Sequence, residues 1–468
     1  MKQTKLKRGK FAAINSIKGK YQLGRIFSKV LKIILFISVA AITAVYCFKD
    51  FENSKFVVDE YFFIKKSYYF DLLFIKQDIS DTRWYGADST GDVSQPKVGP
   101  YIYGLAFHLA GVKDIERALD DANFNGEMIN NKPWYEVMVG KLPSSFPDKL
   151  YRSLEFLWLA RKTAIVFTIG SIVAIYSLGA SLKNPLFGIT ASFLIASNVL
   201  LKSLGKNATT DTMQLFFFSV NLLLFYKWLL TAHIKKKNKY YAYSFLLGIN
   251  TALGAGVKTS GIMIVFFLAI SILLVVIIEK HYQRTVKHII IGALIISTVG
   301  SGLFYYLHPF IHNDTANTLW DMYYIRTDNY KSYWSQFPAG AITSRSQAAR
   351  IIFERTLAPE GNFINYPFIK LPLDAILFVL GIICLIYRAY KQLLIKKKFP
   401  PDMILFIWMI VVFVSLVFYL NNDWRRYYLP LVSCIAILQA YFISGGVEFS
   451  IKKIIRPFIL AVFTKPNF

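Results

Sequence analysis

The sequence predicts an all-α integral membrane protein that crosses the bilayer about ten times. Its 468 residues are 55% hydrophobic and 16% aromatic, and their mean hydropathy is +0.41. A single soluble core of this length would not contain so much apolar sequence, whereas repeated bilayer crossing requires it. The apolar residues also fall into separate runs of roughly 20, which is the length of helix that spans the hydrocarbon core.

The basic residues lie mainly in the short connections between those runs. The chain has 54 Lys and Arg against 28 Asp and Glu, which gives a net charge of +26. In a soluble protein this balance would suggest nucleic acid as a partner, but here the positive-inside rule accounts for it, so we expect no nucleic-acid partner. Cys47, Cys384 and Cys434 lie in or at apolar runs without metal-ligand spacing, which argues against a disulfide framework and against a zinc site.

The N-terminal part of the chain predicts a tail, an anchor and a first outer loop. Residues 1–29 are rich in Lys and Arg, so the positive-inside rule places them in the cytoplasm. The first apolar run, 30–48, follows a basic region that is too long for an ordinary signal peptide, and we expect it to remain as a membrane anchor. Residues 49–155 then form the first outer loop.

Two segments of the first outer loop are predicted to be juxtamembrane helices that lie in the interface. Residues 61–76 mix aromatic side chains with lysines, and residues 100–112 are apolar but too short to cross the bilayer comfortably. The alternative for 100–112 is a short transmembrane span. That span would invert every later loop and place the most basic connections outside, so parity favours the interfacial helix.

Nine further apolar runs are predicted to be spans, and a second large outer loop separates the sixth of them from the seventh. This loop covers residues 308–370, and a basic tail at 447–468 ends the chain. The transmembrane domain is therefore expected at 30–446, with both tails in the cytoplasm and a Lys or Arg in every cytoplasmic connection. The predicted spans are 156–178, 186–204, 213–230, 241–256, 261–278, 289–307, 371–387, 403–420 and 429–443.

Several ionisable residues fall on the predicted outer side, at or near helix ends. Such groups at the edge of hydrocarbon are costly and usually serve a task. Each has a simpler explanation by itself, because Asp211 is placed to cap a helix, Lys258 to snorkel and Arg425 with Arg426 to anchor the interface. Their convergence on one face favours a shared site. The residues are Asp59, Glu60, Lys97, Asp211, Lys258, Arg425 and Arg426.

This combination of charges suits the transfer of a sugar from a lipid phosphate. A carboxylate near the membrane accepts a proton from the attacking hydroxyl or amine. Lysines and arginines beside it hold the phosphate and stabilise the negative charge that grows on the leaving group. A nucleotide-sugar donor is less consistent with the sequence, because no Rossmann-type pattern is present and the candidate centre faces away from the cytoplasm.

Short segments that carry these residues follow one another in a fixed order along the chain. They begin directly after the first span and end at the last one. They are Asp59-Glu60 before Tyr61, Pro96 to Tyr101 leading to Leu109-Ala110-Gly111, Arg161 at the start of a span, Asp211 before Met213 to Phe217, Gly254 to Gly261 around Lys258, and Arg426-Tyr427-Tyr428-Leu429-Pro430.

In their order and topology these segments resemble the GT-C glycosyltransferases that take a sugar from a polyprenyl phosphate. That superfamily includes the protein O-mannosyltransferases and the bacterial aminoarabinose transferases that modify lipid A, and the likeness covers residues 30–446. It implies a GT-C-like helical bundle and an inverting transfer. This chain has Ser94-Gln95-Pro96 where those families often have His-Pro-Pro or Glu-Lys-Pro, so its basic residue, Lys97, follows the proline.

The resemblance also implies roles for single residues. Asp59 is the expected catalytic base, with Glu60 as its neighbour or substitute, and only one of two adjacent carboxylates on a helix is expected to face the acceptor. Asp211 is expected to support the same pocket, and Lys258 to contact the donor phosphate. The remaining expected substrate-binding residues are Gln95, Lys97, Arg161, Arg425 and Arg426.

The second outer loop either caps the cavity and selects the acceptor through its aromatic rings, or merely folds over the spans. His308 and His312 have a spacing that resembles a metal pair, but Pro309 intervenes and no third ligand is evident. No cofactor is therefore assigned, and a divalent metal remains an option without a clear ligand set. The other residues of interest in this loop are Trp320, Asp321, Tyr323, Tyr324, Arg326 and Trp334.

The expected partners are a polyprenyl-phosphate sugar donor, membrane lipids, and a protein, lipid or glycan acceptor. The expected location is the plasma membrane, with the active site on the outer face. A transporter or flippase of a lipid-linked or small polar substrate is the alternative, but such a protein would show inverted repeats and charges near the midplane, and the sequence shows neither. A catalytically silent scaffold is a further alternative, against which the Asp59-Glu60 pair argues.

Overall fold

The structure, a computed structural model, confirms the all-α membrane fold. It describes residues 30–31, 33–49, 51–52, 56–85, 95–122, 148–234, 237–358, 363–366, 369–396 and 398–450. The predicted tail at 1–29 and residues 451–468 of the predicted tail at 447–468 lie outside these ranges. The described part is a helical bundle with one small hairpin, in which β1 (Phe363–Tyr366) pairs antiparallel with β2 (Ile369–Pro372).

Seven helices in the described part are long and apolar enough to cross a membrane. Large apolar side chains on these helices, such as Val166 at 58% exposed and Leu294 at 62%, face away from the protein interior and therefore suit lipid. The chain is thus an integral membrane protein. The seven segments are Arg152–Leu182, Thr210–Ala232, Thr259–Ile278, Thr285–Tyr306, Leu373–Ile395, Pro401–Tyr419 and Arg425–Gly445.

Three of the ten predicted spans are helices that do not meet this criterion. Ile33–Phe48 and Pro185–Ser197 are apolar but short, and α11 (Lys237–Val257) is helical over 21 residues with a more polar start. The single helix predicted at 186–204 is wrong. The chain breaks at Asn198, whose backbone is extended and whose side chain accepts hydrogen bonds from the N–H groups of Leu200 and Leu201. The total number of bilayer crossings stays a prediction.

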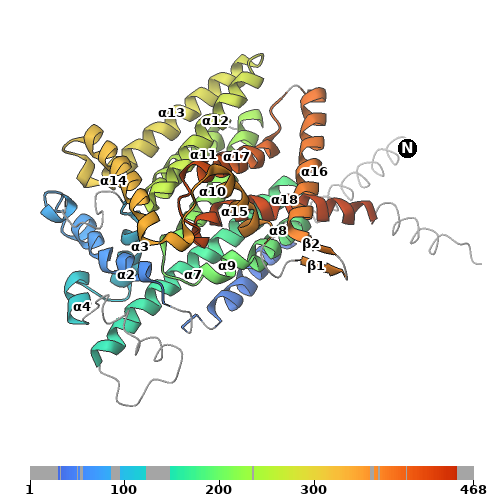
Figure 1. The fold of residues 1–468 in the computed structure, drawn as a ribbon. Coiled ribbons are helices and arrows are strands. Elements are labelled where there is room, and N and C mark those ends of the chain that lie inside the picture. Colours follow the sequence, from blue (N-terminus) through green and yellow to red (C-terminus); the bar gives the residue numbers. More distant parts are fainter. Residues whose placement is uncertain are drawn as a thin grey trace, which may run out of the picture.

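The bundle is built on α7, α10 and α11, which come from the middle of the sequence. Helix α10 packs against α7 and α11, α11 packs against α13, and α18 packs against α8 and α16 (Figure 1). The helix predicted to start at residue 156 begins earlier, at Asp148. The bounds are α7 Asp148–Leu182, α8 Pro185–Ser197, α9 Val199–Leu204, α10 Thr210–Ile234, α12 Met263–Ile278, α13 Gln283–Tyr306, α16 Leu373–Lys396, α17 Ile404–Tyr419 and α18 Leu429–Ser450.

The two segments predicted as helices in the first outer loop are helical. The segment at 61–76 contains most of α2 (Val58–Lys65) and a π turn at Asp71–Ile75, and the segment at 100–112 contains most of α3 (Val98–Leu109). A further helix, α4 (Ile115–Asp121), was not predicted. With 12 residues, α3 is well short of the ~20 that a span requires, which argues against the alternative span at 100–112. In Figure 1 these helices gather with α14 (Thr315–Gln336) at one end of the bundle, which we call the loop end.

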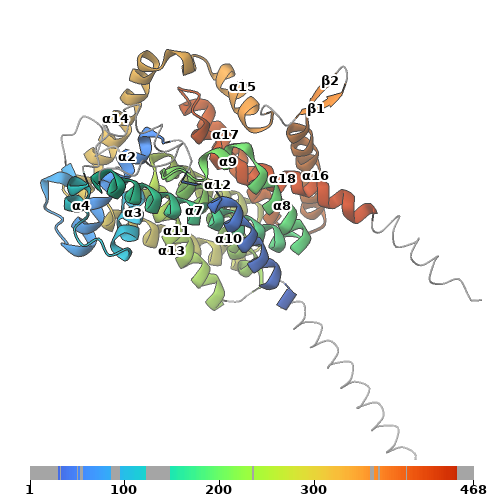
Figure 2. The ribbon, with the colours of Figure 1, turned by 90° about the horizontal axis from the view of Figure 1, so that it is seen from below.

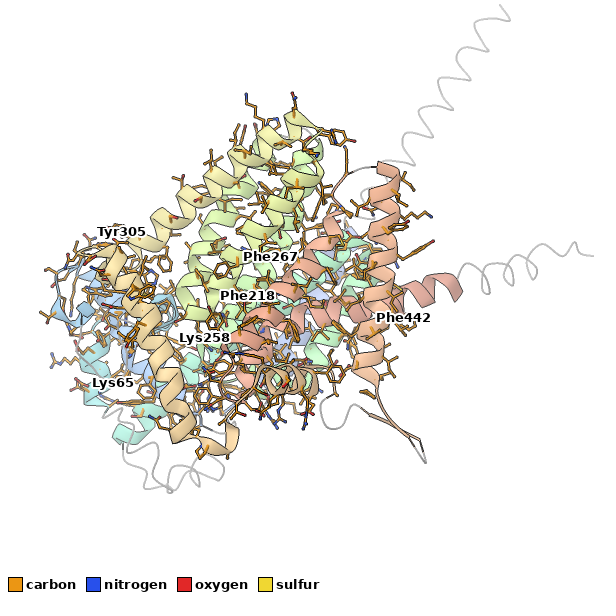
Figure 3. The ribbon with its side chains drawn as sticks, turned by 45° about the horizontal axis from the view of Figure 1, so that its top comes forward. Lys65, Phe218, Lys258, Phe267, Tyr305 and Phe442 are labelled. Atoms are coloured by element: carbon orange, nitrogen blue, oxygen red, sulfur yellow. The ribbon has the colours of Figure 1, made fainter. Side chains whose placement is uncertain are left out.

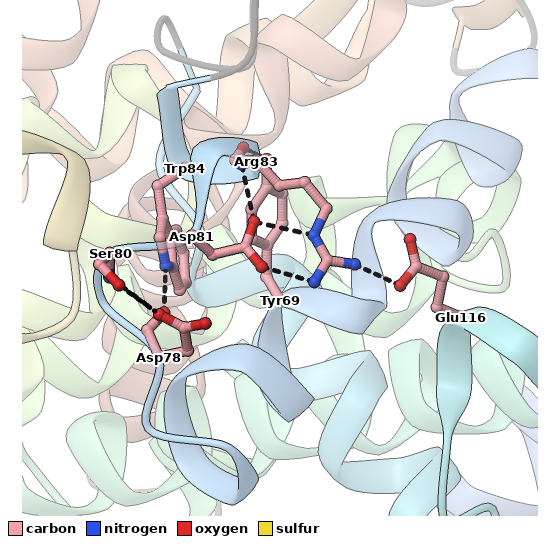
Figure 4. Close-up of polar contacts among 7 residues, drawn as sticks. All are labelled: Tyr69, Asp78, Ser80, Asp81, Arg83, Trp84 and Glu116. Carbon is pink, nitrogen blue, oxygen red and sulfur yellow. Dashed lines mark hydrogen bonds and ion pairs between the residues drawn. The ribbon is translucent and has the colours of Figure 1, made fainter.

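An ionic and aromatic cluster fixes this outer segment internally (Figure 4). The guanidinium of Arg83 donates to both oxygens of Asp81, at 2.9 and 2.6 Å, and also pairs with Glu116 on α4. These hydrogen bonds hold the pKa of Asp81 below its usual value. Trp84 stacks on Tyr69 with ring centroids 4.9 Å apart. The 3₁₀ turn at Thr82–Tyr85 is therefore held against both α4 and the helical turns that follow α2.

The second outer loop, predicted as a loop at 308–370, is largely helical. It contains α14 (Thr315–Gln336) and α15 (Arg345–Thr356), and the β1–β2 hairpin follows them. Figure 2 shows α14 and α15 following one another along one edge of the molecule. A serine caps α15, since the side chain of Ser344 accepts from the N–H of Gln347, and the extended residues around it separate α15 from α14.

Candidate active site at the loop end of the bundle

Helix α2 presents its two adjacent carboxylates in different directions. Asp59 and Glu60 lie in the first turn of α2, where the helix dipole favours negative charge. Successive helical residues point roughly 100° apart, so the two side chains enter different surroundings. Glu60 also caps its own helix, because the N–H of Val57 donates to its Oε2 at 2.9 Å.

Glu60 is a structural anchor and does not reach the pocket. It is fully buried and pairs with Arg161 of α7, with Nε to Oε1 at 2.9 Å and Nη2 to Oε2 at 3.0 Å. The N–H of Ala208, just before α10, also donates to Oε1 at 2.7 Å. Arg161 is equally buried and donates further to the carbonyl of Phe51. The pair thus joins α2, α7 and the start of α10, and this position does not fit the expected catalytic role of Glu60 or the expected substrate-binding role of Arg161.

A pocket brings together five of the predicted site residues from distant parts of the chain. It lies between α2, the segment before α3, the start of α10, the end of α11 and the turn before α18. Figure 3 shows Lys258 near this end of the bundle, whereas Phe218 and Phe267 lie in the interior. The lining residues are Asp59, Phe63, Gln95, Pro96, Thr210, Asp211, Val257, Lys258, Thr259, Trp424, Arg426 and Tyr427.

The charged residues of the pocket form two ion pairs. Lys258 Nζ lies 2.5 Å from Asp211 Oδ1, and Arg426 Nη1 pairs with Asp59 Oδ2. The side chain of Asp211 is 4% exposed and that of Asp59 is 29% exposed, so the Asp59 pair is the one that solvent reaches. Both cations therefore carry a carboxylate partner.

Helix ends and a backbone break place these charges. Asp211 lies in the first turn of α10. Lys258 has extended backbone between the end of α11 and a 3₁₀ turn at Thr259–Ile262, and from this break its side chain reaches Asp211 of α10. The turn is tied to α10 by a hydrogen bond of 2.7 Å from Gln214 Nε2 to Ser260 Oγ. It also packs closely on α11, because a Cβ at Gly261 would lie 2.8 Å from the Cα of Ala255.

Two aromatic residues that the sequence analysis did not assign to the site line the pocket beside these cations. The guanidinium carbon of Arg426 lies 4.7 Å from the Trp424 ring centroid, and Lys258 Nζ lies 5.1 Å from that of Tyr427. Such contacts favour the cationic side chains and hold them in place. The sequence did contain an indication that Trp424 belongs to the site, because it stands directly before the two arginines. The neighbouring Arg425 is exposed and does not line the pocket.

Lys97 is buried and does not line the pocket. It is 1% exposed, and its Nζ lies 4.5 Å from the ring centroid of Tyr69 and 5.5 Å from that of Phe310. The residues just before it, Gln95 and Pro96, do line the pocket. The side chain of Lys97, which follows the proline, is therefore enclosed by aromatic rings. This position of its ammonium group does not fit direct contact with a donor phosphate.

His308 links the segment before α3 to the end of α13. Its Nδ1–H donates to the carbonyl of Phe304 at 2.7 Å, which leaves Nε2 to accept from the N–H of Lys97 at 3.3 Å. Burial lowers the pKa of His308 to about 4, so the ring is neutral at physiological pH. A ring nitrogen of His312 contacts the carbonyl of Tyr305 at 2.8 Å. The two histidines are therefore engaged by backbone groups and do not form the pair of metal ligands that their spacing suggests.

The donor set of the pocket does not form a complete metal site. Asp59 and Asp211 are its carboxylates, and each is paired with a cation. No group of three or more His, Cys, Asp or Glu side chains arranged to hold a metal occurs among the residues that the structure describes. We derive no step through a metal. The aromatic residues Trp320 and Tyr324 of α14 are exposed, and the side chains of Tyr323, Arg326 and Trp334 lie outside the described residues.

The fold is similar to that of membrane glycosyltransferases of known structure. No protein-family model and no curated protein matches this sequence. Among solved structures, the archaeal oligosaccharyltransferase AglB from Archaeoglobus fulgidus, in complex with an inhibitory peptide and a dolichol-phosphate, superposes with a TM-score of 0.52 at 14% identity, over 92% of this chain and 52% of AglB. ArnT from Cupriavidus metallidurans, bound to undecaprenyl phosphate, gives a TM-score of 0.50 at 12% identity, over 88% of this chain and 60% of ArnT.

These likenesses establish the fold and not the reaction, because both identities are low. The chain spans about half the length of AglB, at 52%. The resemblance that the ordered sequence motifs predict is confirmed at this level: the described residues form a helical membrane domain with the architecture of the GT-C glycosyltransferases AglB and ArnT.

Proposed function

We propose that this chain is a membrane glycosyltransferase that transfers a sugar from a polyprenyl-phosphate donor to an acceptor. The observation that carries the proposal is the pocket in which Asp59 and Asp211 meet Lys258 and Arg426. These residues come from four distant segments of a chain with the fold of lipid-dependent glycosyltransferases. Both similar structures were solved with a polyprenol phosphate, which supports a donor of this class.

The four charges suffice for an inverting displacement. The acceptor oxygen or nitrogen forms a bond to the anomeric carbon on the face opposite the phosphate, while Asp59 takes its proton. The bond from that carbon to the phosphate oxygen breaks, and its electron pair leaves with the phosphate. Lys258 and Arg426 stabilise the charge that grows there. Asp211 keeps Lys258 in position through their 2.5 Å contact.

The ion pairs indicate how the donor prepares the base. Arg426 pairs with Asp59, so the carboxylate is held by a cation. A donor phosphate that takes Arg426 as its own partner releases Asp59 to accept a proton from the acceptor.

An apolar groove beside the pocket suits the isoprenoid chain of the donor. It has a volume of about 480 Å³ and lies between α11, α12, α13 and the start of α14. Ala255 and Ile262, which line it, lie on either side of Lys258 in the sequence, so a phosphate at Lys258 is next to the groove. An isoprenoid chain has the apolar surface that such a lining favours.

The proposal includes the side of the membrane. The pocket lies at the loop end of the bundle, and the sequence places the basic connections at the opposite end, which supports an outer-face site with both termini in the cytoplasm. A plasma-membrane location and a protein, lipid or glycan acceptor are part of the proposal. The pocket charges gather at one end of the bundle, which favours an enzyme over a transporter with charges near the midplane.

The experiment is transfer of radiolabelled sugar from a panel of polyprenyl-phosphate monosaccharides in membranes that contain the protein. Because general-base catalysis contributes about 10²–10⁴-fold, Asp59→Asn should reduce transfer by at least ~10²-fold. The control is Asp321→Asn, which alters an exposed aspartate of α14 outside the pocket and should leave transfer unchanged. Equal transfer by wild type and Asp59→Asn would remove Asp59 as the base, and no transfer from any donor would contradict the proposed class.

A further inference from the structure

The turn that carries Arg426 is held from outside the pocket by a residue of the second outer loop. Arg355, in the last turn of α15, donates from Nε to Oδ2 of Asp423 at 3.0 Å and to Oδ1 at 3.2 Å, and from Nη2 to Oδ2 at 2.5 Å. This two-nitrogen contact fixes the orientation of the carboxylate as well as its position. Asp423 stands three residues before Arg426 in the sequence.

Asp423 is ionised and saturated with donors. Tyr428 donates its hydroxyl to Oδ1 of Asp423 at 2.8 Å. This hydrogen bond joins the two ends of the turn at residues 423–428. Partial burial opposes ionisation of Asp423, but the hydrogen bonds from Arg355 and Tyr428 outweigh it and hold the pKa of the carboxyl below its usual value. The same contact raises the pKa of Arg355. The pair therefore stays charged throughout the physiological range.

Backbone contacts join the same turn to the outer loop. The N–H of Asp423 donates to the carbonyl of Gly340 at 2.9 Å, and the N–H of Ile342 donates to the carbonyl of Asn421 at 2.8 Å. The ring of Trp424 meets that of Phe337 edge to face, with centroids 5.7 Å apart. The segment between α14 and α15 thus contacts the turn whose residues Trp424, Arg426 and Tyr427 line the pocket.

From these contacts we infer that Arg355 is a positioning residue for the transfer reaction, acting through Asp423 on Arg426. The assignment of Arg426 to the donor phosphate rests on the function proposed above. Arg355 does not line the pocket, but it fixes the turn from which Trp424, Arg426 and Tyr427 enter it. Docking of α15 on this turn therefore sets the place of a phosphate-binding cation.

The matched control lies on the same helix. Arg350 and Glu354 of α15 form an exposed ion pair at 2.9 Å, with side chains 78% and 49% exposed, and neither residue lines the pocket. Arg350→Ala removes an arginine and an ion pair from α15 without touching the 423–428 turn. Arg355→Ala removes the contact with Asp423. A difference between the two variants therefore reports the turn and not the general stability of α15.

The first measurement does not depend on activity. Arginine labelling with phenylglyoxal, mapped by peptide mass spectrometry on the full-length protein, reports the reactivity of Arg426, and the exposed Arg425 beside it is an internal reference. We expect Arg355→Ala to raise the ratio of Arg426 to Arg425 labelling several-fold, because Arg426 is no longer held against Asp59. Arg350→Ala should leave the ratio at the wild-type value. An unchanged ratio in Arg355→Ala would overturn the inference.

The second measurement is steady-state transfer with the donor that wild type uses. Arg355→Ala should lower kcat/KM for the donor at least tenfold, and Arg355→Lys, which restores the charge without the planar fork, should recover part of this loss. Tyr428→Phe is the second variant, for use where Arg355→Ala folds poorly. It removes only one hydroxyl contact to Asp423 and should lower kcat/KM by a smaller factor. If Arg355→Ala transfers sugar with wild-type kinetics, the inference about Arg355 is contradicted and the proposed function stands. If Arg355→Ala changes the labelling of Arg426 but neither wild type nor variant transfers sugar, Arg355 still holds Arg426 in place and the proposed function is contradicted.

Discussion

At the scale of single residues, two neighbouring carboxylates have different surroundings because successive residues of a helix point in different directions. Asp59 is partly exposed and paired with Arg426 in the pocket. Glu60 is fully buried and its oxygens accept from Arg161, from Ala208 and from the N–H of Val57. A side chain whose oxygens are saturated by the protein is not available as a base, whereas one held by a single exchangeable cation is.

We predict that Glu60→Gln destabilises the protein far more than Asp59→Asn. Removing one partner of a buried ion pair leaves an uncompensated buried charge, here on Arg161, and typically costs about 3–5 kcal/mol. The exposure of both side chains of this pair is 0%, whereas the side chain of Asp59 is 29% exposed. Thermal unfolding in detergent, followed by intrinsic fluorescence, should show a large drop in Tm for Glu60→Gln and little change for Asp59→Asn. Equal shifts in Tm for the two variants would refute the structural role of Glu60.

At the scale of elements, glycines set how closely helices approach. A Cβ at Gly188 of α8 would lie 2.6 Å from the carbonyl oxygen of Tyr176 and 2.9 Å from the N of Ala180, both on α7. The opposing glycine, Gly179, is equally close to α8, since its Cβ would lie 2.9 Å from the Cα of Gly188. Small residues at a membrane-helix contact allow this approach of two backbones. The α7–α8 contact therefore depends on the absence of side chains.

Gly188→Ala should accordingly destabilise the protein, and Gly302→Ala should not. Gly302 lies in α13, and a Cβ added there would have no neighbouring atom within 4 Å, so an added methyl group meets open space. Alanine is the better helix former by about 1 kcal/mol, which favours Gly302→Ala but is outweighed by the backbone clash at Gly188. The check is the midpoint temperature of each variant, together with the yield of monodisperse protein. A Gly188→Ala variant as stable as Gly302→Ala would disprove the close contact.

The sequence predicted the positions of the main helices better than it predicted where a helix is interrupted. Apolar runs and their spacing predicted the main helices, because length and composition decide whether a segment suits the bilayer. The break at Asn198 depends on one side chain that competes for backbone N–H groups, and no change of hydropathy marks it. Helices α14 and α15 lie within the predicted second outer loop, for which the sequence analysis gave no secondary structure because it contains no apolar run long enough to span the bilayer.

The candidate site follows the same logic. Asp59, Asp211, Lys258 and Arg426 were identified because charges at helix ends on one side of a membrane are expensive and converge. The direction of a side chain does not follow from such an argument. Lys97 is positively charged and follows two residues that line the pocket, but its own side chain packs against Tyr69 and does not line the pocket. Arg355 was not identified because its effect passes through Asp423, in a segment distant in sequence.

At the scale of the whole molecule, charge and helix direction together determine orientation. Helix α12 begins just after the pocket turn at Thr259–Ile262 and ends at Ile278. At 1.5 Å per residue its 16 residues extend ~24 Å, so its two ends lie near opposite surfaces of the bilayer. The connection after α12 carries Lys280, and the connection between α3 and α4 at the loop end carries Lys113; both side chains are exposed.

The positive-inside rule and the helix directions predict that Lys113 lies outside and Lys280 lies in the cytoplasm. We would replace Cys47, Cys384 and Cys434 by alanine, introduce Lys113→Cys or Lys280→Cys separately, and treat intact cells with a membrane-impermeant maleimide. The Lys113→Cys variant should be labelled in intact cells, and the Lys280→Cys variant only after permeabilisation. Retained stability of the cysteine-free parent is the control, since Cys434 is fully buried. The reverse labelling pattern would place the pocket on the cytoplasmic face, where water-soluble donors would have access and the argument for an exclusively lipid-linked donor would lose its topological support.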